Sequence, residues 1–551
     1  MKKKVGLLIN SLLVSKQVEN LIELSKSSAN YEITTLIINK HEDSKKTIIS
    51  KIANYINRRG LKKLISNIFF ICICKFEEIL MRRHEKFSNI YSTYKLSEEK
   101  YQIITLKPWI SRSKIVYKYS KSDVEKIKNS NLNCIIRCGF GIYKGDILNA
   151  CPNGIISFHH GDNNRYRGGP PGFWEVYHRN PRTGFIIQRL NEELDGGDVL
   201  FRGFINTKWF YSMNLAALYE ISNPYLHNVI EDITSNSPSF FPQKKIPYSF
   251  PLYTIPNVFE SLEYIFKTSI KFINKKLIKI IGKSYKWGIA YQFVDDWQDV
   301  NIRRSKKIIN PKNRFLADPF IIKKNGKHYC FVEDFDYKIN KGNISVYEIT
   351  VDGYKELGIA LKEDFHLSFP FLFEYENELF MCPETHEKNE IRIYKCLEFP
   401  LRWVFYKTIM KDVSAADTVI FKHKEIWWLL TSIDRSVIKD HSCQLHVFHN
   451  SNPLNEKWVP HSKNPVIFDS KTGRNGGLII EDHNVYRVFQ HQGFDMYGKG
   501  LGIAKLNTLT YDEFDEEILI ELESKFFKDI LGTHTYNFNN GLLVIDYLKV
   551  N

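Results

Sequence analysis

The sequence lacks the patterns that mark disulfide-stabilised, zinc-binding and membrane-spanning proteins. Its nine cysteines are an odd number, and none belongs to a CxxC pair, which argues against a disulfide framework and against a zinc site. The most apolar run, IFFICIC at 68–74, is far shorter than the roughly 20 residues of a membrane-spanning helix. We therefore expect reduced cysteines, no metal ion and no transmembrane helix, in a cytoplasmic protein that can also lie at the inner face of the membrane.

The amino-terminal residues resemble a secretory signal peptide only in part. The basic start MKKK and the short apolar stretch VGLLIN are followed by Gln17, Glu19 and Asn20, with no small-residue cleavage site. We interpret VGLLIN as the first β-strand of the fold.

Length, composition and charge narrow the class of protein. A chain of 551 residues exceeds one ordinary core, so two or three domains are expected. The aromatic share of 14% favours a β-rich portion. The formal charge of +15 suits nucleic acid, an anionic membrane or a phosphorylated substrate, although scattered lysine beside abundant Asn and Ile also follows from an AT-rich genome. No basic and aromatic motif of a nucleic-acid reader is present, so we expect no nucleic-acid partner.

The first half alternates apolar runs with helical patterns. The runs VGLLIN (5–10), ITTLIIN (33–39), YQIITL (101–106) and LNCIIRCG (132–139) are typical of buried strands. This alternation predicts an α/β domain of Rossmann type with a parallel, doubly wound sheet. Ligands bind such sheets beyond the carboxyl ends of the strands.

A basic and amphipathic insert at about 44–95 interrupts this alternation. We expect it to be helical. Packing on the sheet, capping of the cleft and contact with a membrane are all compatible with its composition.

Polar residues crowd the end of the next strand in IISFHHGDNNRYRG (155–168). A histidine follows the strand, Arg-Gly comes eight residues later, and a proline-started aromatic segment leads to TGFIIQRLNEELDGGDVLFRG. Upstream, the GFG of residues 139–141 lacks the GxGxxG spacing of a dinucleotide fingerprint, and a tight turn is its simplest interpretation.

This order of motifs resembles the formyltransferase family that uses N10-formyltetrahydrofolate, whose members act on methionyl-tRNA, glycinamide ribonucleotide and nucleotide-linked amino sugars. The resemblance covers roughly residues 1–230 and is strongest from 139 to 203. The family's catalytic trio is Asn, His and Asp. His159 and Asp195 match the last two, whereas Ser157 stands where the asparagine is expected. The resemblance implies substrate or cofactor contacts by Gly139, Phe140, Gly141, His160, Asn163, Arg167 and Gly168.

The implied chemistry explains the residue types. A primary amine attacks the formyl carbon, and an oxyanion forms, so the site needs a proton acceptor and hydrogen-bond donors. His159 would accept the amine proton or donate to the oxyanion, and Asp195 would orient the ring. Ser157 offers a shorter donor than asparagine. His160, Asn163 or Asn164 can supply the donor instead, or formyl transfer has been lost.

The second half repeats a pair of strands five times. The segments are 316–334, 368–385, 415–432, 475–491 and 534–547, and each runs from a polar entry through an apolar strand and a turn to an aromatic strand. Their spacing of roughly 50 to 60 residues is that of propeller blades. We therefore predict a five-bladed β-propeller over 301–551, preceded by a connector at 231–300 and by the formyltransferase-like domain at 1–230.

This half resembles the five-bladed propellers of arabinanase- and xylosidase-type glycoside hydrolases, and the propeller-like domain attached to some sugar-transfer enzymes. Asp318 in LADPF and Asp417 in AADTV match the hydrolase base and the carboxylate that tunes it, but RNGG at 474–477 carries no glutamate where the acid is expected. We expect a funnel that binds glycan, with His534 among its residues. Glu333, Glu384, His534 and Asp546 are the alternatives for an acid role.

Two functions follow as hypotheses. The first is a bacterial-type transferase that formylates a nucleotide- or lipid-linked amino sugar in surface-polysaccharide synthesis, with N10-formyltetrahydrofolate as donor. The second is a glycan-binding or glycosyl-transferring protein whose formyltransferase-like half is catalytically altered.

Overall fold

The computed structural model describes residues 2–40, 48–84, 86–111, 115–139, 141–236, 238, 243, 246–281 and 283–550. Phe140, which the sequence places in the cofactor loop, lies outside these residues. The chain divides into two compact units, Met1–Lys271 and Phe272–Asn551.

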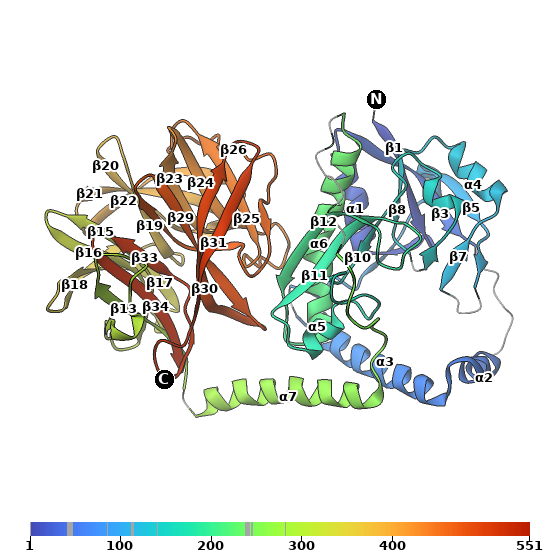
Figure 1. The fold of residues 1–551 in the computed structure, drawn as a ribbon, viewed down its shortest axis with the longest axis horizontal. Helices are drawn as coiled ribbons and strands as arrows, with labels where there is room; N and C mark the ends of the chain where they lie inside the picture. The colour runs from blue at the N-terminus through green and yellow to red at the C-terminus, as the bar shows by residue number, and fades with distance from the viewer. Residues whose placement is uncertain are drawn as a thin grey trace. The chain divides into compact units, whose positions relative to one another are not determined.

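A seven-stranded sheet in the order β12-β11-β10-β8-β1-β3-β5 forms the centre of the first unit (Figure 1). Its strands are β1 (Lys3–Ile9), β3 (Tyr31–Asn39), β5 (Gln102–Leu106), β8 (Cys134–Arg137), β10 (Ile155–His159), β11 (Arg182–Arg189) and β12 (Asp198–Asn206). The prediction of a parallel sheet is correct for β10, β8, β1, β3 and β5. It is wrong for β11 and β12, which run antiparallel, because a turn at 190–197 joins them directly as a hairpin and no crossover helix intervenes.

Helices cover the sheet and extend away from it. The helices of this unit are α1 (Lys16–Lys26), α2 (Ile48–Arg59), α3 (Leu61–Arg82), α4 (Lys121–Lys128), α5 (Phe173–Tyr177) and α6 (Tyr211–Ile233), and α7 (Val258–Ile280) begins in it. α1 and α6 pack on each other, α6 lies on β11 and β12, and α4 lies on β5. α2 and α3 fall in the basic insert. No helix among the described residues is long and apolar enough to cross a membrane.

Small sheets complete the first unit. One pairs β2 (Leu13–Ser15) with β4 (Thr93–Lys95), and the other joins β6 (Trp109–Ile110), β7 (Val116–Lys118) and β9 (Ile142–Tyr143). Single 3-10 turns lie at Glu98–Lys100 and Asp146–Asn149. The core between sheet and helices contains aliphatic side chains with no measurable exposure, such as Leu8, Ile37 and Ile135.

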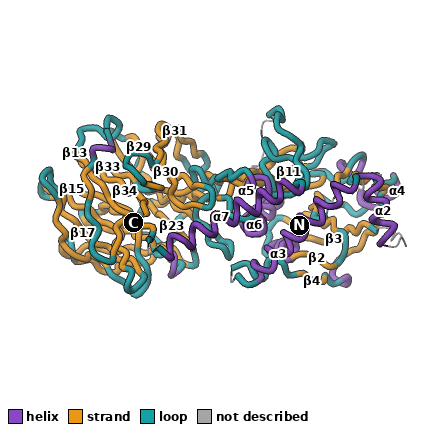
Figure 2. Tube along the Cα trace, turned by 90° about the horizontal axis from the view of Figure 1, so that it is seen from below, coloured by secondary structure: helices purple, strands orange, loops and turns teal. Residues whose placement is uncertain are grey.

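The second unit is rich in β-strands, which Figure 2 shows as orange tubes. Its strands form five sheets. Four of them are built from strands that are consecutive in the chain. The first contains β15 (Arg314–Lys324), β16 (Lys327–Asp336), β17 (Lys341–Ile349) and β18 (Tyr354–Leu361), and the second contains β19 (Ser368–Tyr375), β20 (Glu378–Glu384), β21 (Glu390–Glu398) and β22 (Arg402–Lys411).

The third and fourth sheets follow in the same way. The third contains β23 (Ala415–His423), β24 (Ile426–Ile433), β25 (Gln444–Asn450), β26 (Val459–Pro460) and β27 (Ile467–Phe468), and the fourth contains β28 (Arg474–Glu481), β29 (Asn484–Gly493), β30 (Met496–Leu509) and β31 (Phe514–Glu523).

The fifth sheet joins the two ends of the unit. It contains β13 (Tyr285–Phe293), β14 (Lys306–Lys307), β32 (Ile530–Gly532), β33 (Tyr536–Asn539) and β34 (Leu542–Val550). β13 pairs with β34 over nine residues. The range 231–300, expected as a connector, therefore holds α7 and the strand β13 of this sheet.

One strand from each of the five sheets contacts the next in a closed order. β15 contacts β19, β19 contacts β23, β23 contacts β28, β28 contacts β33, and β33 contacts β15. Each of the five repeated segments in the sequence forms one of these strands together with its antiparallel neighbour. The polar entry of each segment therefore lies at the strand that faces the other sheets.

Candidate functional site

A cavity of about 630 Å³ opens in the first unit where β1, β8 and β10 end. The carboxyl ends of parallel strands meet at one edge, and ligands collect there. The polar residues that line this cavity include Asn10, Gln17, Arg137, Ser157, His159, His160, Asp195 and Asn223, from five parts of the chain.

His159 and Asp195 contact each other inside this cavity. Nδ1 of His159 lies 3.2 Å from Oδ1 of Asp195, and the Gly168 N–H donates to Oδ2 at 3.1 Å. Burial alone would raise the pKa of Asp195, but the His159 ring and the Gly168 N–H outweigh it and hold this pKa below its ordinary value. Asp195 is thus an ionised carboxylate that fixes the orientation of the imidazole.

The second nitrogen of His159 is the one left for a ligand. Nε2 lies 3.3 Å from the carbonyl oxygen of Tyr166, which is long for a hydrogen bond. A substrate atom can replace this contact at little cost.

Ser157 lies in the cavity wall but offers it no proton. Its side chain is 1% exposed, and its hydroxyl donates to the carbonyl oxygen of Phe158 at 3.0 Å. A hydroxyl carries one hydrogen. The expected role of Ser157 as a direct donor therefore does not agree with this arrangement.

His160 is a packed neutral ring. Burial, with His159 and Arg137 nearby, lowers its pKa to about 3. Its ring lies edge-on to Tyr219 with centroids 4.5 Å apart, and Nε2 is 3.4 Å from the Ser222 hydroxyl. His160 lines the cavity as a neutral side chain.

Asn163 and Arg167 line a different cavity, of about 480 Å³. The Asn163 amide oxygen accepts from Arg202 at 2.7 Å, and the Arg167 guanidinium lies over the Tyr248 ring. Asn164 belongs to the same lining. These residues therefore line a cavity other than that of His159, although the Asn163 amide donates to the carbonyl oxygen of Asp195 at 3.4 Å, and their role in substrate or cofactor binding stays a prediction.

Three predicted glycines occupy close approaches of the backbone. Gly168 has φ +101°, and a Cβ there would lie 2.2 Å from the carbonyl oxygen of Tyr253. Gly141 has φ +116°, and a Cβ would meet the Tyr117 ring. A Cβ on Gly139 would lie 2.9 Å from the Asn10 amide oxygen. Side chains are excluded at these points.

Arg137 is a functional candidate that was missed at the sequence level. It ends β8 inside the cavity, and its NH1 donates to the Gly141 carbonyl at 2.6 Å. Its Nε is buried without a hydrogen-bond partner among the described residues, and burial lowers its pKa. One feature of the sequence could have identified Arg137: it is a charged residue at the end of the otherwise apolar strand CIIR.

Asn10 is a second missed candidate. Its amide oxygen is buried in the same cavity and accepts no hydrogen bond from the described residues. A buried polar atom without a partner costs free energy unless a ligand or water satisfies it. Arg137 and Asn10 thus leave one donor and one acceptor for a ligand.

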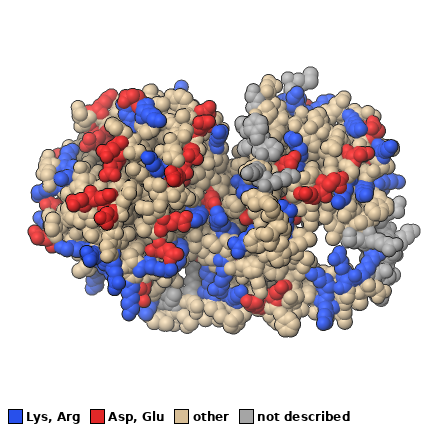
Figure 3. All heavy atoms as spheres, in the orientation of Figure 1, with Lys and Arg blue, Asp and Glu red and all other residues tan. Residues whose placement is uncertain are grey.

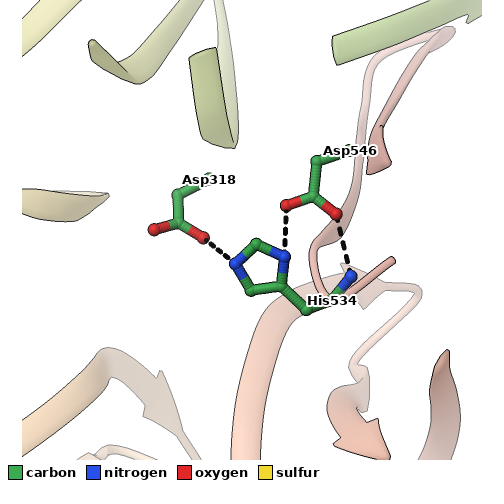
Figure 4. Close-up of side chains that lie close together, drawn as sticks. All are labelled: Asp318, His534 and Asp546. Atoms are coloured by element: carbon green, nitrogen blue, oxygen red, sulfur yellow. Dashed lines mark hydrogen bonds and ion pairs between the residues drawn. The ribbon is translucent and has the colours of Figure 1, made fainter. Parts of the chain in front are cut away.

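In the second unit, His534 bridges two carboxylates (Figure 4). Nε2 lies 3.0 Å from Asp318 Oδ1, and Nδ1 lies 2.6 Å from Asp546 Oδ2. Burial opposes the charged ring, but Asp546 and Asp318 outweigh burial and raise the pKa of His534 to about 10. Atoms of these three residues lie within 4.8 Å of one another and can be considered for a metal ion. Since both ring nitrogens face carboxylates, an imidazolium satisfies the cluster without one.

Asp318 is held by three partners. Besides His534, Oδ1 accepts from the Thr535 hydroxyl at 2.9 Å, and Oδ2 accepts from the Phe369 N–H at 3.2 Å. Asp318 is 5% exposed. These contacts and its burial fix the orientation of the carboxylate.

Asp417 is held by a second set of partners. Nε of Arg474 donates to it at 2.6 Å and Nε2 of Gln490 at 2.7 Å. Glu384 lies 3.6 Å from Arg474 and pairs with His386 at 2.7 Å. The fourth segment therefore begins with a cation, Arg474, where a glutamate was expected. This arginine contacts the carboxylates of Asp417 and Glu384.

A buried acid and aromatic rings lie near these groups. Burial and the Asp318 charge raise the pKa of Glu333 well above its ordinary value. The Trp287 ring centroid is 4.0 Å from that of His534, and Tyr497 is 40% exposed. Aromatic faces beside charged groups are suited to sugar rings.

The first unit is a formyltransferase-like α/β domain, and the second is a β-rich region of many sheets. Residues 300–540 match the family model described as "Glucosamine inositolphosphorylceramide transferase 1, N-terminal".

Similar proteins include transferases of two kinds and a glycoside hydrolase. The Arabidopsis thaliana glucosamine inositolphosphorylceramide transferase 1 is 36% identical over 220 residues, which are 39% of this chain and 28% of the relative. The methionyl-tRNA formyltransferase of Ehrlichia ruminantium is 21% identical over 238 residues, 41% of this chain and 76% of the relative. The family 117 glycoside hydrolase Zg3597 of Zobellia galactanivorans is a solved structure with a TM-score of 0.33 and 12% identity, over 48% of this chain and 90% of that one. The chain thus spans less than a third of the length of the plant relative.

Proposed function

We propose that the protein transfers the formyl group of N10-formyltetrahydrofolate to the primary amine of a nucleotide- or lipid-linked amino sugar. The observation that carries the proposal is the His159–Asp195 pair in a cavity at the carboxyl ends of the strands. The similarity to methionyl-tRNA formyltransferases supports it. The similarity to a transferase named for glucosamine and inositolphosphorylceramide supports an amino sugar attached to a lipid.

The cavity residues fit the formyl donor. Ligand pockets usually measure about 300 to 1,000 Å³, and the cavity measures about 630 Å³. Ile9, Val14 and Leu226 provide an apolar lining for a flat ring, and the Asn10 amide oxygen is an acceptor in need of a donor. The donor supplies the carbon that the amine attacks.

His159 and Arg137 have different roles in the proposed formyl transfer. The imidazole, oriented by Asp195, accepts the proton that the amine loses. Arg137 donates from Nε to the oxyanion that forms when the new C–N bond is made, in place of the family's asparagine. When the oxyanion collapses, the bond between the formyl carbon and N10 would break, and His159 would return the proton to N10 of the departing tetrahydrofolate.

In this proposal the second unit is a five-bladed propeller that recognises carbohydrate. The closed order of the first strands and the pairing of β13 with β34 support five blades. Binding is favoured over hydrolysis, because paired-carboxylate hydrolysis needs an acid beside the base and RNGG at 474–477 carries no glutamate where that acid is expected.

The test is an assay with purified protein, N10-formyltetrahydrofolate and a panel of nucleotide- and lipid-linked amino sugars. Tetrahydrofolate release and the mass of the product are followed together. His159→Ala is expected to lower the rate about 10²- to 10⁴-fold, whereas Lys144→Met, at an exposed ion pair with Glu192, keeps it. Glycan binding without folate binding would contradict the proposal and favour a glycan-binding protein with an altered first unit.

A further inference from the structure

The helix α3 has apolar side chains on its exposed side. Phe70, Glu77 and Met81 face the protein interior. On the opposite side Leu61, Ile65, Ile68, Phe76 and Ile79 are exposed, with Phe76 at 65%. A surface helix of a water-soluble domain normally presents polar side chains there, and contiguous exposed apolar patches mark interaction sites.

The helix α7 repeats this arrangement. Ser261 and Tyr264 are buried, whereas Phe259, Leu262 and Phe266 are exposed, with Phe259 at 83%. The Tyr264 hydroxyl donates to Glu77 of α3, and it accepts from the Tyr211 N–H at 2.7 Å. α3 and the first turns of α7 are thus fastened to the same side of the first unit, as Figures 1 and 2 show. We name the exposed residues of α3 and of 258–271 the α3–α7 face.

Basic side chains border this face. Lys62, Arg82 and Arg83 lie on or directly after α3 and are exposed, and Figure 3 shows Lys and Arg gathered over α2 and α3. The acid Glu78 is paired with Lys75 and Arg82. Apolar side chains bordered by cations complement an anionic lipid surface, where each Lys or Arg contributes about 1 kcal/mol.

The face is continuous with the loop that holds the catalytic pair. An apolar cavity of about 460 Å³ is lined by Phe70, Ile71 and Cys74 of α3 and by Gly169 and Pro170. Gly169 directly follows Gly168, whose N–H donates to Asp195. A bilayer on the α3–α7 face would therefore lie close to the site at which a lipid-linked acceptor reacts.

We propose that the α3–α7 face docks the protein on an anionic lipid bilayer, with its apolar side chains in the interface and its cations at the headgroups. A second copy of the chain is a poorer occupant, since two such faces would bring like charges together. The inference stands on the exposed helices alone and does not depend on formyl transfer.

Vesicle binding of the full chain tests this inference. The protein is expected to sediment with vesicles of phosphatidylcholine and phosphatidylserine, to bind far less to phosphatidylcholine alone, and to be released by salt. Ile68→Ser with Phe76→Ser is expected to lower the partition coefficient at least about tenfold, because each buried side chain contributes roughly 1.5 to 3 kcal/mol. The matched control is Phe405→Ser, an exposed aromatic residue of the second unit.

Cys72 supplies a readout of contact on the face itself. It is exposed on α3, whereas the other cysteines are buried or partly buried. An environment-sensitive fluorophore on Cys72 is expected to shift to shorter wavelength with anionic vesicles, and a Cys72→Ser protein treated identically is expected to show no shift. Equal binding to both vesicle types, absence of binding, or a stable dimer in solution that leaves Cys72 unreactive would overturn the proposal. Formyl transfer from the folate donor is measured separately, without vesicles. A failure of the proposed enzyme activity can therefore be told apart from a failure of the proposed membrane binding.

Discussion

Arg137 and Ser157 are register partners on the neighbouring parallel strands β8 and β10. The serine hydroxyl is turned to the backbone, and the buried guanidinium beside it keeps one N–H without a partner. A cationic donor thus stands next to the position at which formyltransferases carry an asparagine. In the proposed function, this guanidinium on the adjacent strand takes the place of the missing donor.

Substitutions of Arg137 and Ser157 are therefore expected to have different effects on activity. Arg137→Met is expected to lower kcat about 10²- to 10³-fold, the usual effect of losing one oxyanion donor, with little change in KM for the formyl donor. Ser157→Ala is expected to have a much smaller effect, because the hydroxyl serves the Phe158 carbonyl. The measurement is steady-state kinetics of the two variants. Full activity of Arg137→Met, with loss in Ser157→Ala, would reverse the assignment.

Gly168 tests the coupling between the loop and the catalytic carboxylate. Gly168→Ala places a Cβ 2.2 Å from the Tyr253 carbonyl at φ +101°, so the loop must move and the N–H leaves Asp195. We expect a stability loss of about 1 to 3 kcal/mol in urea unfolding, together with loss of activity. Gly353→Ala is the matched control, since no atom lies within 4 Å of its Cβ position. Equal behaviour of the two variants would contradict the role of Gly168.

The raised pKa of His534 predicts that the folded protein loses stability at alkaline pH. Its folded pKa of about 10 lies above its ordinary value of 6.5, so its contribution to stability is complete below pH 6.5 and is lost as the pH rises toward 10. The Tm of the wild type is expected to fall across this range. His534→Gln is expected to start about 3 to 5 kcal/mol less stable, because a carboxylate loses its buried partner, and to show a flatter pH profile. His483→Gln, at an exposed turn, should follow the wild type; an unchanged slope in His534→Gln would disprove the assignment.

The contact between His159 and Asp195 was predictable because the two residues belong to an ordered series of local motifs. His159 directly ends a strand, and Asp195 lies in a glycine-rich turn, so their resemblance to a known pattern survives without tertiary information. That Asn163 and Arg167 line a second cavity could not be predicted, because sequence spacing does not report which way a loop turns. Phe140 stays a prediction, since it lies outside the described residues.

The antiparallel pair β11 and β12 shows a different limit. Both strands are apolar runs, and periodicity does not distinguish strand directions. The length of the connection decides it: eight residues at 190–197 leave no room for a crossover helix. In the second unit, the repeated period of strand pairs predicted which segments form sheets, while the partner of β13 lies more than 240 residues away in β34.

The sequence by itself determined the two kinds of architecture and the His159–Asp195 pair, because hydrophobic period and local motifs act over short distances. Only the tertiary structure decided that Arg137 stands beside Ser157, that His534 bridges Asp318 and Asp546, and that the apolar side of α3 is exposed. Each of these depends on strand register or helix packing between distant segments, where burial and charge are set by neighbours that the order of residues does not reveal.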